Sequence, residues 1–233
     1  GLEVEQLMLH PLASSQAVLT EDERELGVVL VDIGAGTTDV AIFTGGAIRH
    51  TAVIPIAGDL ITSDIAMALR TPTKDAEDIK VESGCAKQLL ADHDTQVEVP
   101  GLGDREPRML SKQALAGVIE PRVEEIYSLV HQVIRESGFE ELLSSGIVIT
   151  GGTSVMPGMI ELGEDIFLKP VRRGIPTYRG ALSDMVAQPR AATVMGLLEE
   201  ARMARLRGHK VAQKAGTVHT ALGRVKDWFV GNF

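Results

Sequence analysis

The residues with the clearest chemical potential form the run DIGAGTTD, from Asp32 to Asp39. The run lies between two apolar, β-branched segments, GVVLV and VAIF, which are typical of buried strands. The glycines therefore connect two strands and do not open a helix, which excludes a dinucleotide-binding fingerprint. A P-loop is also excluded, because no Gly-Lys-Ser/Thr follows the glycines.

A glycine turn between two strands can still bind phosphate. We expect Gly34 and Gly36 to adopt positive φ angles, so that successive amide N–H groups converge on an oxygen that no Cβ obstructs. Asp32 at the strand end could hold a hydrated Mg²⁺, and the Thr37 hydroxyl could add a donor. The alternative is an ordinary glycine-rich hairpin, although D-x-G-x-G-T-x-D is far more specific than Gly-X-Gly. The predicted phosphate site comprises Asp32, Gly34, Ala35, Gly36 and Thr37.

A second glycine pair stands in the run ITGGT at 149–153, at the end of another apolar segment and before an expected helix. By itself such a pair is weak evidence for a ligand. Because it follows the first motif in a chain of alternating strands and helices, two strands of one sheet could present glycines to the two ends of a nucleotide.

The elements that must position these glycines follow from the apolar periodicity. Strands are expected at 2–9, 27–34, 37–46, 47–58 and 146–152. Helices are expected at 11–19, 59–70, 74–83, 111–136, 157–167 and 188–207. The run 20–26 is predicted to be a charged surface connection, and 91–110 a short hairpin or loop. This order of elements indicates an α/β fold.

Composition and charge exclude several classes of protein. The chain has 233 residues and a net charge of −9, so its body does not bind nucleic acid by electrostatics. Residues 201–233 carry +6 and residues 1–200 carry −15, which suggests that the basic tail meets an anionic partner. The single cysteine excludes an internal disulfide and points to a reducing compartment. Uninterrupted apolar runs are far shorter than the roughly 20 residues of a membrane-spanning helix.

The segment 218–233 is predicted to be an amphipathic helix that lies on an anionic membrane surface. At about 100° per residue, its large apolar side chains share an arc of about 140°. These are Val218, Leu222, Val225, Trp228, Phe229 and Phe233. The alternative is a C-terminal helix docked on the protein's own core. The polar linker at 208–217 argues against docking, because it would let the helix leave the body.

Taken together, these motifs resemble those of the actin-like ATPase superfamily and, within it, the FtsA family of bacterial cell-division proteins. The similar stretches include VDIGAGTTDVAIFTGGAIRHTAVIPIAG, DAEDIKVESGCA, GIVITGGTSVMPG and AATVMGLL. The resemblance implies an actin-like (RNase H-like) subdomain with an inserted smaller α/β subdomain and a C-terminal amphipathic helix. It implies that residues 1–19 are the end of the first large subdomain, including a connecting helix. The nucleotide-binding subdomain would comprise 20–57 and 146–207, with the smaller subdomain inserted at 58–145. A linker at 208–217 and the membrane helix at 218–233 would follow.

The resemblance also assigns roles to single residues. It makes DIGAGTTD the second phosphate loop and ITGGTS, with Gly151, Gly152 and Thr153, the adenosine motif. It places Glu77 and Lys80 beside the ribose and adenine. Without the resemblance, these two residues would be interpreted as an exposed ion pair one helical turn apart. ATP and Mg²⁺ are the expected cofactors.

Arg108 and Arg122 each end a Glu-Pro-Arg run within 58–145. Guanidinium groups pair well with carboxylates, although two solvated arginines are the simpler interpretation. The resemblance implies that both contact the acidic C-terminal tail of the tubulin-like protein FtsZ. The expected function is then to tether FtsZ filaments to the cytoplasmic face of the cell membrane at the division site, to help recruit the divisome, and to self-associate into filaments.

Two departures from the family pattern affect these expectations. The family's earlier phosphate loop has no counterpart here, so the chain is expected to be roughly the C-terminal half of such a protein and to bind ATP weakly alone. His10 stands where chaperone-like relatives carry a Glu that orients the attacking water, so ATP hydrolysis is expected to be weak at most. The alternatives are an active ATPase or sugar kinase of the same superfamily, or a PilM-like pilus-assembly protein.

Overall fold

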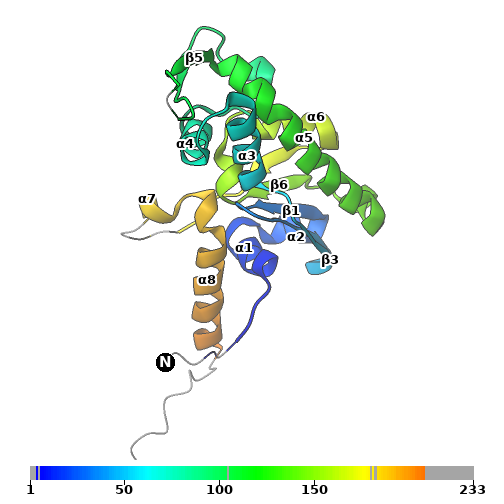
Figure 1. Cartoon of the computed structure of the whole chain (residues 1–233). Helices are drawn as coiled ribbons and strands as arrows, with labels where there is room; N and C mark the ends of the chain where they lie inside the picture. The colour runs from blue at the N-terminus through cyan, green and yellow to red at the C-terminus, as the bar shows by residue number, and fades with distance from the viewer. Residues whose placement is uncertain (1–3, 5, 104, 179, 181–182, 208–233) are drawn as a thin grey trace, which may run out of the picture.

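The computed structural model describes residues 4, 6–103, 105–178, 180 and 183–207 (Figure 1). At its centre is a five-stranded mixed sheet in the order β3-β2-β1-β6-β7. Its strands are β1 (Val28–Ile33), β2 (Thr38–Thr44), β3 (Ala47–Ile54), β6 (Ile147–Thr150) and β7 (Val171–Arg173). β1, β2 and β3 pair antiparallel, whereas β6 and β7 run parallel to β1. The expected α/β fold is confirmed.

Helices cover both faces of this sheet (Figure 1). One face packs on α1 (His10–Val18) and α8 (Ala192–Leu206), and the other on α5 (Lys112–Ser137) and α6 (Met159–Phe167). β1 is buried along its whole length, with Val28 and Leu30 in the cluster beneath α1 and Val29 and Val31 in the larger opposite cluster. This double burial explains why β1 is a continuous apolar run without alternation.

The two helices α1 and α8 lie side by side in Figure 1 and cross at very short range. A Cβ added to Gly196 of α8 would lie 1.7 Å from the carbonyl oxygen of Ala13 in α1. Only a glycine fits such a contact, since any side chain would collide with backbone. The small residues of PLASSQAV and AATVMGLL therefore serve the close packing of these helices.

The segment between β3 and β6 builds the upper part of the molecule in Figure 1. It contains α3 (Gly58–Leu69), α4 (Thr73–Ser83), the antiparallel pair β4 (Gln96–Val99) and β5 (Arg108–Ser111), and α5. The Ser111 hydroxyl caps the start of α5 by accepting the Ala114 N–H, and Gly138 ends the helix at φ 75°. The subdomain boundaries predicted above stay a prediction.

Short elements complete the described chain: α2 (Glu21–Leu26), α7 (Ser183–Val186), and the 3₁₀ turns η1 (Gln88–Leu90), η2 (Glu140–Leu142), η3 (Gly152–Val155) and η4 (Pro189–Ala191). No helix in the ranges given above is long and apolar enough to cross a bilayer. The same described residues contain no group of three or more His, Cys, Asp and Glu side chains arranged to hold a metal ion.

Two local expectations were wrong, and one strand was missed. The strand expected at 2–9 is not formed at residue 4 or residues 6–9. The supposed surface connection at 20–26 contains helix α2, which a capping box starts: Glu23 N–H donates to the Thr20 hydroxyl and the Glu23 carboxylate accepts the Thr20 N–H. The edge strand β7 was not expected, because its three residues are too few to show periodicity.

Candidate functional site

The residues of DIGAGTTD form a tight turn between β1 and β2. The Gly34 N–H donates to the Thr37 carbonyl at 2.9 Å, which closes the turn. Ala35, Gly36 and Thr37 are exposed, and a Cβ on Gly36 would meet no atom within 4 Å. Neither Gly34 nor Gly36 has a positive φ, so the expected left-handed backbone was wrong. Because Gly36 has no side chain, the tip of the turn is unobstructed.

The base of this turn is joined to two distant parts of the chain. The Gly34 carbonyl accepts the Gly58 N–H at 3.2 Å and the Thr153 hydroxyl at 2.8 Å. The Ala35 carbonyl accepts the Asp59 N–H at 2.8 Å. The start of α3 and the loop after β6 therefore meet at the turn, and Thr153 of the second glycine motif is one of the residues that join them.

Gly58 lies at the centre of this junction and was not among the expected site residues. A Cβ at this position would lie 2.5 Å from the Thr153 hydroxyl oxygen and 3.2 Å from the Gly34 carbonyl oxygen. In the sequence, only its position between an expected strand and an expected helix pointed to a special role for Gly58. Glycines at such positions are common in turns, so this signal was too weak to single it out.

Lys80 and Glu77 lie next to this junction, on α4. The Lys80 Nζ donates to the Gly58 carbonyl at 3.1 Å, the Thr62 hydroxyl at 2.8 Å and the Glu77 carboxylate at 2.6 Å. Lys80 is only 8% exposed, so the simple interpretation as a solvated ion pair does not describe it. Burial alone would raise the pKa of Glu77, but the hydrogen bonds from Lys80 and Thr62 outweigh burial and lower it.

A pocket of about 400 Å³ opens beside Glu77, between α3 and α4. Residues with polar or charged side chains line it: Asp59, Thr62, Ser63, Thr73, Lys74, Glu77 and Asp78. Hydroxyl, carboxylate and ammonium groups of this kind can hydrogen-bond a polar ligand such as a sugar. The pocket is adjacent to the turn because Asp59, one of its walls, donates its N–H to Ala35.

Asp32 ends β1 and is 4% exposed. The Ser14 hydroxyl of α1 donates to its carboxylate at 2.5 Å. Burial raises the pKa of Asp32, while the Ser14 hydrogen bond and the nearby His10 oppose the rise, and Asp39 adds to it. The ionised carboxylate is thus incompletely compensated by the protein, and a cation next to it would be favourable.

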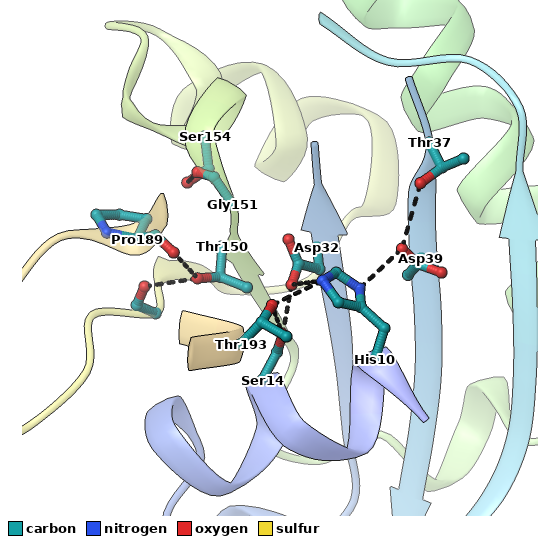
Figure 2. A network of polar contacts seen from close by, with 11 residues as sticks. His10, Ser14, Asp32, Thr37, Asp39, Thr150, Gly151, Ser154, Pro189 and Thr193 are labelled. Atoms are coloured by element: carbon teal, nitrogen blue, oxygen red, sulfur yellow. Dashed lines mark hydrogen bonds and ion pairs between the residues drawn. The ribbon is translucent and has the colours of Figure 1, made fainter. Parts of the chain in front are cut away.

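A network of polar contacts links this carboxylate to both α1 and α8, as Figure 2 shows. His10 Nδ1 lies 3.1 Å from the Asp39 carboxylate, and His10 Nε2 lies 2.7 Å from the Thr193 hydroxyl of α8. The Thr193 hydroxyl is in turn 3.0 Å from that of Ser14. Ser14, Asp39 and Thr193 were not among the expected site residues. Asp39 ends the predicted DIGAGTTD run, whereas the only signal for Ser14 and Thr193 was a hydroxyl residue within each small-residue helix.

The two glycines of the second motif differ in what they do. Gly151 has φ 87°, and a Cβ on it would lie 2.4 Å from the Ile33 carbonyl oxygen and 2.5 Å from Asp32 Oδ1. Gly152 is exposed, and its nearest neighbour would be Arg190 Cβ at 3.9 Å. Gly151 therefore lets β6 end directly against Asp32. The structure brings the predicted residues of 32–37, 77–80 and 151–153 into one region.

The two arginines predicted to bind a partner lie elsewhere and have unlike surroundings. Arg108, at the start of β5, donates from Nη2 to the Leu69 carbonyl at 2.9 Å. Arg122, on α5, donates two hydrogen bonds to the Asp64 carboxylate, from Nε at 2.6 Å and from Nη2 at 3.0 Å, and it also donates to the Glu125 carboxylate. Arg122 is therefore already paired with two carboxylates, Asp64 of α3 and Glu125 of α5. The predicted membrane helix at 218–233 lies outside the described residues.

Three solved structures with a similar fold are distant from this chain in sequence. MreB5 of Spiroplasma citri bound to ADP matches with a TM-score of 0.67 at 20% identity, over 85% of this chain and 60% of that one. A PilM–PilN type IV pilus biogenesis complex matches with a TM-score of 0.64 at 17% identity, over 84% and 52%. The MamK double helical filament matches with a TM-score of 0.62 at 15% identity, over 83% and 58%. These likenesses show an actin-like fold.

Relatives that are closer in sequence cover the whole chain. The cell division protein FtsA of Pseudomonas aeruginosa is 52% identical over 100% of this chain, and that of Escherichia coli K12 is 45% identical over 100%. The chain spans 57% and 58% of the lengths of these two relatives. The family model described as "Cell division protein FtsA" matches residues 29–196. With this match, the chain belongs to the FtsA family of cell division proteins.

Proposed function

We propose that the chain is the nucleotide-binding part of an actin-like scaffold that takes ATP and Mg²⁺. The observation that carries this proposal is the convergence on the Gly34 carbonyl of backbone from α3 and a hydroxyl from the loop after β6. The convergence leaves the tip of the turn open for phosphates. The nucleoside would then lie near the pocket beside Glu77, whose carboxylate accepts a hydrogen bond from Lys80.

Asp32 is the residue that would hold Mg²⁺, through water. Its burial and raised pKa leave a carboxylate that gains from a cation, and oxygen ligands are what Mg²⁺ prefers. The ion would neutralise charge on the phosphate oxygens. Ser14 orients the carboxylate, and Thr37 offers a hydroxyl from the turn.

Slow turnover is the behaviour that the site favours. Both ring nitrogens of His10 already contact protein groups, Asp39 and Thr193, so the imidazole is not free to orient an attacking water. We therefore favour a scaffold over the active ATPase or kinase alternative. Membership of the FtsA family likewise favours a cell-division role over the PilM-like alternative.

For the cellular role, we propose that the protein tethers FtsZ filaments to the cytoplasmic face of the membrane at the division site and helps recruit the divisome. Arg108 and Arg122 would contact the acidic FtsZ tail, and 218–233 would lie on the anionic surface. Self-association into filaments is supported by the fold that the chain shares with MamK, whose structure is a double helical filament. The basic residues of 201–233 would strengthen the membrane contact.

The nucleotide proposal is tested by calorimetry with Mg·ATP and by phosphate release, on the chain extended to the length of its relatives. We expect saturable ATP binding with slow turnover and no stimulation by a panel of sugars. Failure to bind any nucleotide would contradict the proposal, and rapid turnover would restore the enzyme alternative.

The membrane proposal is tested by co-sedimentation with anionic vesicles. We expect the intact chain to bind, and both Trp228→Glu and a truncation at Gly216 to lose most of the binding. Trp228→Phe, which keeps an apolar ring, is the matched control and should bind like the parent. Equal partitioning of all four proteins would rule out the anchor.

A further inference from the structure

Three side chains that join α3 to α4 form a closed set of hydrogen bonds beside the pocket at Glu77. Lys80 Nζ donates to the Thr62 hydroxyl at 2.8 Å and to Glu77 Oε2 at 2.6 Å, and the Thr62 hydroxyl donates to the same Glu77 oxygen. We call this set, Thr62, Glu77 and Lys80, the α3–α4 triangle. Thr62 is only 4% exposed, whereas the Glu77 side chain is 46% exposed. The α3–α4 triangle therefore has two buried members and one that reaches the pocket.

The hydrogens of the two buried members are used within the protein. The Lys80 ammonium has three hydrogens to donate. They match three acceptors, which are the Gly58 carbonyl at 3.1 Å, the Thr62 hydroxyl and the Glu77 carboxylate. Thr62 has a single hydrogen, and its contact with Glu77 is shorter than its 3.2 Å contact with the Gly58 carbonyl. Lys80 and Thr62 therefore have no donor left for a ligand.

Glu77, in contrast, keeps an oxygen that can accept hydrogen bonds. Both bonds that it receives within the α3–α4 triangle end on Oε2, and no donor in the described part of the chain contacts Oε1. A carboxylate oxygen on the wall of a polar pocket can accept from the hydroxyl groups of a ligand. Thr62 and Lys80 therefore fix the carboxylate by one oxygen and leave the other for the pocket.

The α3–α4 triangle is also connected to the β1–β2 turn by the first turn of α3. The Gly58 N–H donates to the Gly34 carbonyl at 3.2 Å, and the Gly58 carbonyl accepts from Lys80. Thr62 follows four residues later, which is about 6 Å along a helix that rises 1.5 Å per residue. The first turn of α3 thus acts as a spacer between the β1–β2 turn and the Glu77 carboxylate.

We propose that Thr62 is a positioning residue for the nucleotide: it holds the Glu77 carboxylate where Oε1 accepts hydrogen bonds from the ribose hydroxyls. Lys80 acts in the same way, through Glu77 and without touching the ligand. This inference rests on the proposed function, and it makes the ribose the part of the nucleotide that the α3–α4 triangle selects. A carboxylate that is already fixed loses less side-chain entropy when the ligand binds. Thr62 was not among the expected site residues.

The test compares the affinity for ATP with that for 2′,3′-dideoxy-ATP, which lacks both ribose hydroxyls. Calorimetry on the chain extended to the length of its relatives measures both. The parent should bind ATP at least about tenfold more tightly, because the analogue leaves the carboxylate without its donors. Thr62→Val keeps the shape of the side chain but removes the hydroxyl, and it should reduce this preference about threefold or more by weakening ATP. Thr62→Ala should do the same, and Thr62→Ser should restore most of the preference.

Thr71→Val is the matched control. Thr71 lies between α3 and α4 and is also 4% exposed, but its hydroxyl has no hydrogen-bond partner in the described part of the chain. Removing this hydroxyl should leave the preference for ATP unchanged, with a Tm equal to or higher than that of the parent. A loss of preference as large as that in Thr62→Val would overturn the inference, because any buried hydroxyl in this region would then suffice.

A double variant shows whether Thr62 acts through Glu77. In a Glu77→Ala background there is no carboxylate to hold, so Thr62→Val should not change the preference further. If it does, or if Thr62→Val alone leaves both affinities unchanged or weakens both nucleotides by the same factor, the positioning role is overturned while the nucleotide proposal stands. If the parent binds both nucleotides equally well, the ribose assignment is overturned. If the parent binds neither, the inference and the nucleotide proposal are overturned together.

Discussion

The β1–β2 turn differs in construction from a pocket that lies between the end of α3 and the β4–β5 pair and is lined by Arg70, Arg105 and Arg108. At the turn, backbone groups from segments far apart in the sequence are hydrogen-bonded to one another, and Gly58 and Gly151 allow the close approach. At this pocket, charged side chains lie around the end of α3 and the β4–β5 pair. The first region is defined by shape and the second by charge.

This difference predicts how each region fails. A region defined by close backbone contacts should be damaged by added atoms, at a cost to folding, and should respond little to salt. A region defined by exposed charges should tolerate changes of volume, lose ligand affinity when a charge is removed, and weaken as ionic strength rises. Each of the following changes is expected to show one of these two behaviours.

The largest effect should come from Gly151→Ala. Its Cβ would overlap the Ile33 carbonyl and the Asp32 carboxylate, and φ 87° adds backbone strain, so the free energy of unfolding should fall by about 2–4 kcal/mol. Urea unfolding measures this loss. Gly152→Ala is the matched control, because its nearest neighbour would be 3.9 Å away, and it should cost less than about 1 kcal/mol. Equal stability of the two variants would show that the turn is not defined by shape.

The next effect should come from Gly36→Val, which adds a branched side chain to the open tip of the turn. No protein atom lies within 4 Å of the new Cβ, so stability should change by less than about 1 kcal/mol. The side chain would occupy the space proposed for phosphate, so affinity for Mg·ATP should fall by about thirtyfold or more, roughly 2 kcal/mol. Calorimetry on the chain extended to the length of its relatives gives both values. Normal ATP affinity in this variant would remove the phosphate assignment.

A smaller effect should distinguish Arg108 from Arg122 by how much each contributes to the stability of the fold. Arg122→Gln breaks the two-point contact with a partly buried Asp64, so unfolding free energy should fall by about 1–2 kcal/mol. Arg108→Gln removes one bond to a carbonyl at an exposed position and should cost less than about 1 kcal/mol. A double-mutant cycle with Asp64→Asn measures the coupling. If Arg122 shows no coupling to Asp64, its charge is as available to an anionic ligand as that of Arg108.

The smallest effect should appear in the pH dependence of Glu77. Its pKa in the folded protein is lower than its ordinary value of 4.5, so the carboxylate stabilises the fold above that pH, and this contribution is lost as the pH falls through the lowered pKa. Glu77→Gln should therefore have a slightly lower Tm than the parent at pH 7, and the difference should disappear in acid. A Tm difference that persists unchanged at low pH would assign the effect to packing.

Much of this architecture was accessible from local sequence pattern. The apolar runs before and after DIGAGTTD, and the spacing of Val123, Ile126, Tyr127, Val130 and Ile134, were sufficient to predict β1, β2 and α5. These elements bury whole faces, so their periodicity is strong. Helix α2 also had a readable signal, the capping box from Thr20 to Glu23, which the charge of the segment obscured. β7 had none, since three residues at a sheet edge show no period.

By itself, the sequence determined where the turn lies and that its tip is open, because strand patterning and glycine placement are local properties of the chain. Only the tertiary structure decided that Gly58 joins the turn to the loop after β6, and that His10, Ser14 and Thr193 link two helices to Asp32. It also distinguished Arg108 from Arg122: both end a Glu-Pro-Arg run, but Arg108 donates to a carbonyl and Arg122 to a carboxylate. Such contacts join residues far apart in the chain, and they arise only when packing brings distant elements together.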